Sequence, residues 1–533
     1  MIDQTASRRF VFMFLIVVLG GLIFVRWGHR DIYPLESNSI QTQLKRFSDV
    51  FYYVNRYYVE APDQEKIVTG AIQGMLSELD PHSVYIPRER LERVTEQFEG
   101  SYEGIGIEFI ILNKVLTVVS PIVGGPSEAV GLLPGDQIIR IEDESAYGIT
   151  EDEVQDKLRG PKGSKVKVSI RRPSQPDPFE VTITRDKIPI YSLTSAFMLD
   201  DGITGYIWLS RFAKTTAQEL TEALDKLEAQ GMKQLIFDLR HNSGGYLEQA
   251  FAVADKFIPG GYKIVYTRGR LKSAGEDFYS TDRNTYSMFP LVVLINSGSA
   301  SASEIVAGAV QDLDRGLILG ETSFGKGLVQ NQIPLKDGSA LRLTVARYYT
   351  PSGRLIQRPY DDGLMDYYTD ALDDSVRNIP DSTKVYQTLA GRTVYGGGGI
   401  TPDIFLKPSR ITRFTNQLIG RRIFFEFGSN FASRNRELAD DFEKFKDEFR
   451  ISDAMLDELK ALIDKAELEF SGEAFEKDLD YIKLMMKADI ARHLWDSEHY
   501  YMIRITGDDD VRKAIEKMPE AIRIGELHAW KDD

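Results

Sequence analysis

Residues 291–306 read LVVLINSGSASASEIV, and this stretch decides the fold of the largest domain. Its first five residues are apolar and mostly β-branched, as in a buried strand. Residues 296–298 have the composition of a tight turn. Ser301 and Glu304 then have the spacing of a helix capping box, so a helix is expected to begin at Ser301. A buried strand that leads through a turn into a helix is the repeating unit of an α/β sheet.

The same alternation of strand and helix patterns continues on both sides of this stretch. Short apolar runs at 234–239 and 291–295 predict buried strands. Amphipathic stretches at 216–230 and 303–313 predict helices. Residues 188–408 are therefore predicted to form an α/β domain.

Outside this domain the sequence divides into four further segments. Residues 38–97 have apolar side chains at helical spacing and are predicted to form a helical segment. Residues 98–187 consist of short β-rich runs separated by glycine and proline, which predicts a small, mostly β domain. Residues 409–533 carry apolar side chains at three- and four-residue intervals among many charges, which predicts an amphipathic helical domain. The fourth segment, residues 1–30, has the pattern of a signal anchor.

In that segment, Arg8 and Arg9 precede an uncharged apolar run at 10–25, which Arg26 ends. The run is slightly shorter than the roughly 20 residues of a full membrane span, so a cleaved signal peptide remains an alternative to an uncleaved transmembrane anchor. In either case the bulk of the chain is expected to be exported. An uncleaved anchor would hold it on the inner membrane, facing the periplasm or another extracytoplasmic space.

The composition excludes several classes of function. The 533 residues carry a net charge of −15, which would repel a phosphate backbone, so nucleic acid is not expected as a partner. The chain has no cysteine, which excludes disulfides, thiolate metal sites and cysteine nucleophiles. With 42% hydrophobic and 27% charged residues, the composition is that of a folded globular protein.

Ser301 is the candidate nucleophile, because free N–H groups at a helix N-terminus stabilise developing negative charge. A serine at this position is most often only a cap, so catalysis needs a partner base. Lys326 lies in a glycine turn after a short apolar strand, and burial would lower its pKa from about 10.4 and free the amine. Gln330 would share a face with Lys326 in an extended segment, where its amide can orient the lysine.

Other interpretations of this region stay open on sequence alone. His241 follows a strand end and is the best-placed histidine for a different serine hydrolase. Gly320, Gly325 and Lys326 are one residue short of a phosphate-binding P-loop. Against that interpretation, Gly327 stands where a P-loop needs serine or threonine, and the segment after it is extended rather than helical. A surface lysine without a chemical role is the remaining interpretation.

Five motifs, in their order and spacing, resemble those of the carboxyl-terminal processing (tail-specific) peptidases. They are Asp238-Leu239-Arg240 with Gly244-Gly245, residues 299–304, Gly325-Lys326-Gly327 with Gln330, residues 349–353, and residues 399–403. The resemblance implies a protease core of the ClpP/crotonase type with an inserted PDZ domain. It implies Ser301 as nucleophile, Lys326 as general base and Gln330 as the orienting partner of the lysine. The oxyanion donors that it implies are the backbone N–H groups of Ala302 and of one glycine in the Gly244-Gly245 pair, with Gly245 preferred.

The β-rich segment resembles a PDZ domain. Gly104-Ile105-Gly106-Ile107 precedes an apolar strand, and the run at 127–139 follows at the distance expected of that fold. Amides of such a loop can hold a terminal carboxylate while a peptide adds a strand to the sheet. A small β module that only packs against the protease is the alternative. Arg159, just before Gly160, is the candidate for a charged link between the two domains.

The sequence therefore predicts a multidomain serine endopeptidase that recognises the C-terminal ends of protein substrates and cleaves them through an acyl-enzyme. No metal ion or organic cofactor is expected. Expected partners are substrates with accessible C-termini, the membrane through the N-terminal anchor, and an adaptor or a second copy through the C-terminal helices. The alternative is a non-catalytic peptide-binding scaffold, against which the complete set of Ser301, Lys326 and Gln330 argues.

Overall fold

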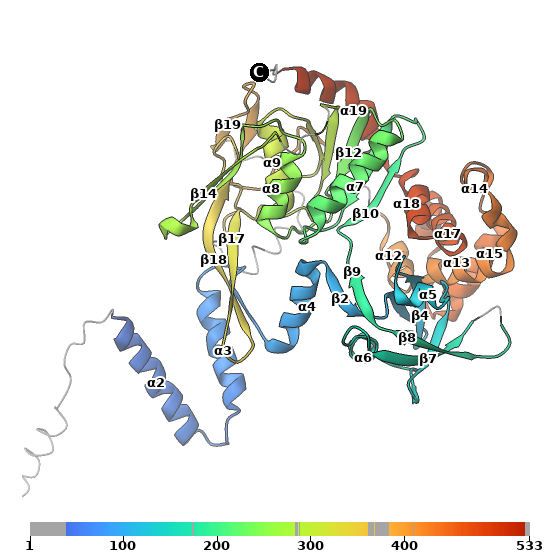
Figure 1. Cartoon of the computed structure of the whole chain (residues 1–533), viewed down its shortest axis with the longest axis horizontal. Coiled ribbons are helices and arrows are strands. Elements are labelled where there is room, and N and C mark those ends of the chain that lie inside the picture. Colours follow the sequence, from blue (N-terminus) through green and yellow to red (C-terminus); the bar gives the residue numbers. More distant parts are fainter. Residues whose placement is uncertain are drawn as a thin grey trace, which may run out of the picture. The chain divides into compact units, whose positions relative to one another are not determined.

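The computed structural model describes residues 39–172, 175–282, 286, 288–360, 367, 383–408 and 410–527 (Figure 1). The chain divides into two compact units, Met1–Glu78 and Leu79–Asp533. The predicted signal anchor lies outside the described residues. Within the described part, no helix combines the length and the apolar character that a membrane crossing requires.

The described part of the first unit consists of two helices, α2 (Ile40–Tyr57) and α3 (Gln64–Ser77). The Ser39 side chain accepts a hydrogen bond from the Thr42 amide at the start of α2. Asp63 caps α3 in the same way, through the Lys66 amide. The prediction of a helical N-terminal segment is confirmed here.

The prediction of helices up to residue 97 was wrong at one place in the second unit. Strand β1 (Val84–Ile86) precedes α4 (Arg88–Glu99) and pairs antiparallel with β18 (Ala340–Tyr349). Three residues are too few to show a strand pattern in the sequence. Their partner strand lies more than 250 positions later in the chain, where Ala340 pairs with Ile86.

The small β domain is built on an antiparallel sheet in the order β3-β4-β5-β7-β8, with β6 beside β5. Its elements are β3 (Ile107–Leu112), β4 (Val115–Pro121), α5 (Pro126–Ala129), β5 (Gln137–Ile141), β6 (Glu144–Ser145), α6 (Glu151–Leu158), β7 (Lys165–Arg171) and β8 (Phe179–Thr184). The strands β2 (Ser101–Gly104) and β9 (Asp186–Pro189) pair with each other where the chain enters and leaves the domain. Leu116, Ile138 and Val168 lie in its separate hydrophobic core.

The α/β domain has a six-stranded sheet in the order β10-β11-β12-β15-β16-β21, parallel from β11 onward. Its strands are β10 (Leu193–Met198), β11 (Thr204–Leu209), β12 (Gln234–Asp238), β15 (Leu291–Ile295), β16 (Leu317–Gly320) and β21 (Ile404–Phe405). A second sheet joins β1, β17 (Leu328–Pro334), β18, β13 (Lys263–Gly269) and β14 (Glu276–Tyr279). Strands β19 (Val385–Gln387) and β20 (Thr393–Tyr395) form a hairpin.

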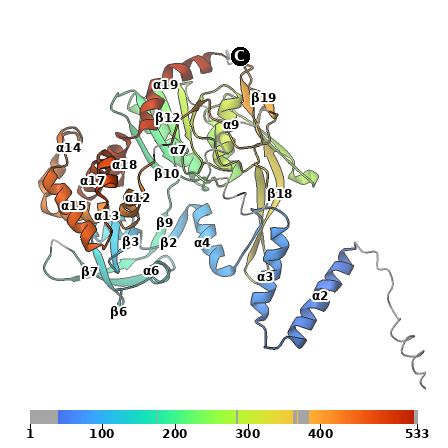
Figure 2. The same ribbon diagram turned by 180° about the vertical axis from the view of Figure 1, so that it is seen from behind.

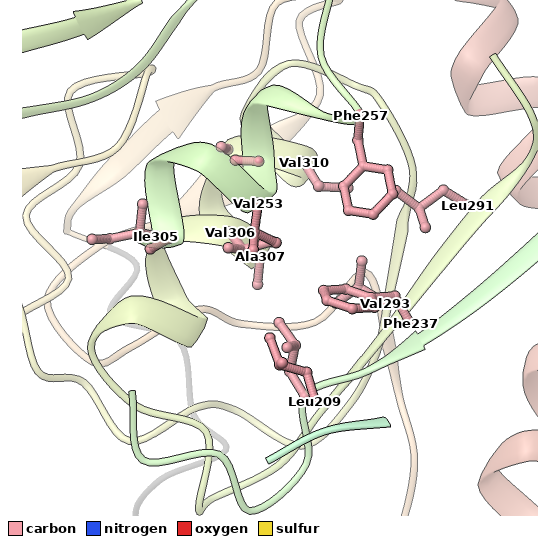
Figure 3. Close-up of a cluster of buried hydrophobic side chains, with 14 of the residues drawn as sticks. Leu209, Phe237, Val253, Phe257, Leu291, Val293, Ile305, Val306, Ala307 and Val310 are labelled. Carbon is pink, nitrogen blue, oxygen red and sulfur yellow. The ribbon is translucent and has the colours of Figure 1, made fainter. Parts of the chain in front are cut away.

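Both faces of the six-stranded sheet are buried, because side chains alternate along each strand. Phe237 and Val293 face the helices α7 (Thr216–Ala229), α8 (Leu247–Asp255) and α9 (Ala302–Asp312). Figure 3 shows these two side chains in one cluster with Val253 of α8 and Val306 of α9. The side chain of Ile236, next to Phe237, points to the opposite face of the sheet. There it packs in one cluster with the helix α19 (Asp509–Glu526) (Figure 2).

The C-terminal region is helical, as predicted. Its helices are α12 (Arg413–Gly420), α13 (Ile423–Arg434), α14 (Phe442–Glu448), α15 (Asp453–Lys465), α16 (Gly472–Lys477), α17 (Leu479–Leu494), α18 (Ser497–Ile505) and α19 (Asp509–Glu526). Helices α12 to α18 enclose a core of their own, with Leu459 and Met486 inside. Helix α19 does not contribute to that core. Its apolar face, with Val511 and Met518, covers the sheet of the α/β domain instead.

Candidate active site

A cleft of about 1050 Å³ brings together five residues that the sequence singled out. Ser301, Ala302, Lys326, Gln330 and Gly245 all line it. The walls come from α4, the loop after β12, the start of α9 and the paired strands β17 and β18. The peptide-binding candidates at 104–107 and Arg159 do not line this cleft.

Ser301 occupies a strained backbone position at the start of α9. Its φ of 56° and ψ of −111° lie in a region that side-chain-bearing residues rarely adopt, at a cost on the order of 1–3 kcal/mol. Such strain persists only where the surroundings fix it. Here the Ser301 amide donates to Glu304 Oε2 at 2.7 Å, and the Ser301 carbonyl accepts from the Tyr348 hydroxyl at 3.0 Å. The serine is therefore held on the cleft wall by contacts to its backbone.

The buried carboxylate of Glu304 joins the serine to the lysine loop. It accepts hydrogen bonds from the amides of Ser301, Gly325 and Lys326 at 2.7–2.9 Å and from the Ser323 hydroxyl at 2.5 Å. Burial raises the pKa of Glu304, and these donors oppose that effect. The sequence indicated Glu304 as a capping residue but gave no sign that its second oxygen binds residues 323–325.

Tyr348 makes a second connection between the two loops. Its hydroxyl, on β18, lies 3.0 Å from the Ser301 carbonyl oxygen and 2.7 Å from the Lys326 carbonyl oxygen. Ser301 and Lys326 are thus tied together twice, through their amides by Glu304 and through their carbonyls by Tyr348. No sequence motif pointed to this tyrosine.

Lys326 has the electrostatic environment of a base. Burial, and then the positive charge of Arg342, lower its pKa to about 8, against the opposing effect of Glu304 and Asp80. Its ammonium donates to Gln330 Oε1 at 2.9 Å. Gln330 Nε2 in turn donates to the His82 carbonyl oxygen at 2.6 Å, which fixes the amide with its oxygen toward the lysine.

The turn that supplies the His82 carbonyl was missed in the sequence. Asp80 organises it, because its carboxylate accepts hydrogen bonds from the amides of His82 and Ser83, both at 2.8 Å. Thr344 of β18 docks the turn through its amide, which donates to Ser83 Oγ at 3.1 Å. The Asp-Pro pair at 80–81 is a turn signal that the sequence does contain.

The loop after β12 contains Gly245, one of the two predicted oxyanion donors. A Cβ on Gly245 would lie 2.0 Å from the Phe212 carbonyl oxygen, so only glycine fits there. The Gly244 amide is already engaged, since it donates to Asn242 Oδ1 at 2.9 Å. The amides of Gly245 and Ala302 donate no hydrogen bond to any described residue. Gly245 and Ala302 line the same cleft as Ser301.

The geometry favours Lys326 over the rival His241. His241 is not among the residues that line the cleft. Asn296 holds it, accepting from its amide at 2.9 Å and contacting the ring nitrogens at 3.0 and 3.3 Å. The P-loop interpretation also fails, because the amides of Gly325 and Lys326 bind Glu304 and are not free for phosphate, and strand β17 follows in place of a helix.

The candidate peptide site lies at the edge of the small β sheet. Strand β3 is the edge strand of that sheet among the described elements. The preceding amides of Ile105 and Gly106 donate no hydrogen bond to a described residue, whereas the Ile105 carbonyl accepts from Ser127. This arrangement provides free N–H donors for a carboxylate and an open edge for a peptide strand.

Arg159 lies at the end of α6, between the small β domain and the cleft wall. Its guanidinium forms an ion pair with Glu96 of α4 and lies 4.8 Å from the centre of the Tyr102 ring. Helix α4 itself lines the cleft through Phe98. Arg159 therefore contacts a helix that lines the cleft.

Four family models match the chain. Residues 203–363 match peptidase family S41, and residues 117–172 match the PDZ domain. Residues 31–90 match the N-terminal domain of the activating protease CtpB. Residues 414–496 match a family of unknown function, DUF8443.

Curated relatives agree with these matches. A carboxy-terminal-processing protease of Bartonella bacilliformis is 42% identical over 59% of this chain and 73% of its own length. The carboxy-terminal processing protease CtpA of Bacillus subtilis is 35% identical over 66% of this chain and 74% of its own length. Among solved structures, a photosystem II D1 C-terminal processing protease is 29% identical, with a TM-score of 0.35 over 70% of this chain and 95% of its own.

Proposed function

Since this chain belongs to the carboxyl-terminal processing serine proteases of peptidase family S41, we propose that Ser301 is its nucleophile and Lys326 its general base. One observation carries the proposal. The buried Glu304 carboxylate binds the amides of both residues, so that serine and lysine share one wall of the cleft.

The reaction begins with neutral Lys326, which accepts the proton of the Ser301 hydroxyl as its oxygen attacks the scissile carbonyl carbon. The amides of Gly245 and Ala302 receive the negative charge that develops on the carbonyl oxygen. Lys326 then gives its proton to the leaving amine, and the C–N bond breaks. Water deprotonated by the same lysine hydrolyses the ester on Ser301 and frees the enzyme.

The lowered pKa is what makes a lysine usable in this role. At the ordinary value of about 10.4, roughly one lysine in 2500 is neutral at pH 7. At a pKa of about 8, the neutral fraction is about one in eleven. Gln330 supports the role by holding the amine through its oriented side-chain oxygen.

We also propose that the PDZ domain binds the C-terminal ends of substrates. The substrate carboxylate is placed on the amides of Ile105 and Gly106, and the peptide strand adds to the open edge of β3. A peptide with a free C-terminal carboxylate should then bind more tightly than its C-terminal amide in a calorimetric titration. Equal affinities would contradict this placement.

For its location we propose the cell envelope, with the bulk outside the cytoplasm and residues 10–25 as membrane anchor. The support is the apolar run behind Arg8 and Arg9. Fractionation of cells is expected to recover the full-length chain with the membrane. Protease added to whole cells should digest it only after the outer membrane or cell wall has been made permeable. Recovery in the cytoplasmic fraction would contradict the proposal.

The test of the catalytic assignment compares the wild type with Ser301→Ala and Lys326→Ala on an unstructured protein that ends in an apolar C-terminus. Circular dichroism checks the fold of each variant. Both variants are expected to lose cleavage. Activity that survives in Lys326→Ala would return the base role to another group such as His241, and an inert, well-folded wild type would favour the peptide-binding scaffold.

A further inference from the structure

The protein contains a buried charge cluster that the proposed mechanism does not use. The Arg240 guanidinium, whose side chain is 15% exposed, forms ion pairs with three carboxylates. Asp238 at the end of β12 lies 2.6 Å from Nη2. Asp508 lies 2.8 Å from Nη2, and Asp510 lies 2.9 Å from Nη1. The last two carboxylates come from the C-terminal helix, 268 and 270 positions away along the chain.

Arg240 lies two positions before residues 242–245, which are here called the oxyanion loop. Two positions later, Asn242 holds the rest of the loop, because its Oδ1 accepts from the Gly244 amide at 2.9 Å. The Asn242 carbonyl accepts from the amide of Ala300 at 2.9 Å and from the hydroxyl of Ser303 at 2.8 Å, on either side of Ser301. Asn242 therefore connects this loop to the backbone on both sides of the nucleophile.

Gly245 has no side chain, so the backbone contacts of its neighbours set its position; on one side the Tyr246 amide donates to the Phe212 carbonyl at 3.0 Å. The loop is anchored at its far end by the amide of Phe212, which donates to the Gly244 carbonyl at 3.0 Å. At its near end the Arg240 carbonyl accepts from Trp208 Nε1 at 3.3 Å and the His241 amide donates to Asn296 Oδ1 at 2.9 Å, and the ion pairs of the Arg240 guanidinium add to these contacts. The planar guanidinium binds Asp238 along one edge and the two α19 carboxylates along the other.

Helix α19 also docks on the sheet through apolar contacts. Its apolar face, with Val511, Ala514 and Met518, packs on the sheet opposite α9. Asp509, between the two, points away and pairs with Arg512 at the surface, where it is 68% exposed. Docking is thus supplied by apolar burial, while Asp508 and Asp510 contact Arg240.

We propose that Asp508 and Asp510 are positioning residues of the protease, which hold the oxyanion loop 242–245 in its catalytic conformation through Arg240. The C-terminal helix then completes the active site from the opposite face of the sheet. The inference rests on the proposed role of Gly245 and Ala302 as oxyanion donors. Without the two carboxylates, the Arg240 guanidinium keeps only Asp238, and the loop loses one of the contacts that hold its near end.

The three consecutive aspartates provide a matched comparison in the full-length chain. Asp508→Asn/Asp510→Asn removes both charges from Arg240, and asparagine at 508 keeps the helix cap. Asp509→Asn removes a charge from the same helical turn without touching Arg240. Because the loss of an oxyanion donor costs about 100- to 1000-fold in kcat, a partial displacement in the double variant should cost at least about tenfold in kcat, with KM within about twofold. Asp509→Asn should retain wild-type kcat.

A general loss of folded protein must be separated from a misplaced loop. Titration of Ser301 to completion with a fluorophosphonate counts the competent enzyme, and kcat is expressed per titrated site. If the double variant does not fold, Asp510→Asn alone is used, and a smaller loss in kcat without a change in KM is expected.

Wild-type kcat per site in the folded charge variants would overturn the inference, and so would an equal loss in Asp509→Asn. Ser301→Ala distinguishes this failure from a failure of the catalytic assignment. If Ser301→Ala still cleaves substrate, the assignment itself is wrong. If it is inert while the α19 variants are fully active, only the positioning role is wrong.

Discussion

The pH dependence of cleavage follows from the environment of Lys326. Its pKa of about 8 predicts that kcat/KM rises about tenfold per pH unit below pH 7 and levels off above pH 8. The neutral fraction is about one half at pH 8 and about one hundredth at pH 6, so activity should fall about fiftyfold between them. His82, whose pKa burial lowers to about 4, remains neutral throughout this range and adds no step.

Arg342 provides the perturbation that identifies the titrating group. Its positive charge is the second cause, after burial, of the lowered pKa of Lys326. Arg342→Gln removes that charge, so the pKa of Lys326 should rise and the midpoint of the profile should move to higher pH. Arg347→Gln on the same strand is the matched control, because the Arg347 side chain is exposed.

The assay is initial-rate cleavage of an unstructured fluorescent substrate between pH 5.5 and 10, with far-ultraviolet circular dichroism at each pH. A midpoint near 8 that rises in Arg342→Gln and stays in Arg347→Gln is the predicted outcome. A flat profile between pH 6 and 8, or a midpoint that falls in Arg342→Gln, would refute the reasoning.

Three substitutions test the other contacts. Glu304→Gln replaces an oxygen that accepts hydrogen bonds, so it should lower the free energy of unfolding by about 2–6 kcal/mol; an unchanged melting temperature would contradict this. Gly245→Ala places a Cβ against the Phe212 carbonyl and should lower kcat by about 100-fold or more. Gly420→Ala, where a Cβ meets open space, should leave kcat unchanged; equal kcat values in the two variants would contradict the role of Gly245. Arg159→Ala should abolish the stimulation of turnover by a C-terminal peptide and leave unstimulated turnover intact, and unchanged stimulation would exclude the link.

Local sequence signals predicted the elements that local interactions determine. The strand at 291–295 has the predicted bounds, because an apolar run followed by turn residues specifies it within a few positions. The segment after Gly327 is extended, as predicted, and a strand follows residues 104–107, as predicted. The glycines at 244–245 were recognisable as well. Close backbone approach to Phe212 and Ser301 leaves no room for a side chain.

Contacts between segments that are distant along the chain could not be predicted from the sequence. The carbonyl of His82 orients Gln330 across 248 positions, and Asp508 reaches Arg240 across 268. No periodicity or motif in the sequence indicates either contact, because each depends on how whole elements pack. Strand β1 was missed for the same reason: it is a strand because β18 lies beside it.

The central claim is that Ser301 is the nucleophile and that Lys326 activates it. The most direct measurement is the rate and position of labelling by a fluorophosphonate, in which the serine oxygen displaces fluoride, followed by mass spectrometry of the digested protein. The account predicts one label on Ser301 in the wild type, none in Ser301→Ala, and labelling at least about 100-fold slower in Lys326→Ala. A label on another residue, or a wild-type labelling rate in Lys326→Ala, would contradict it.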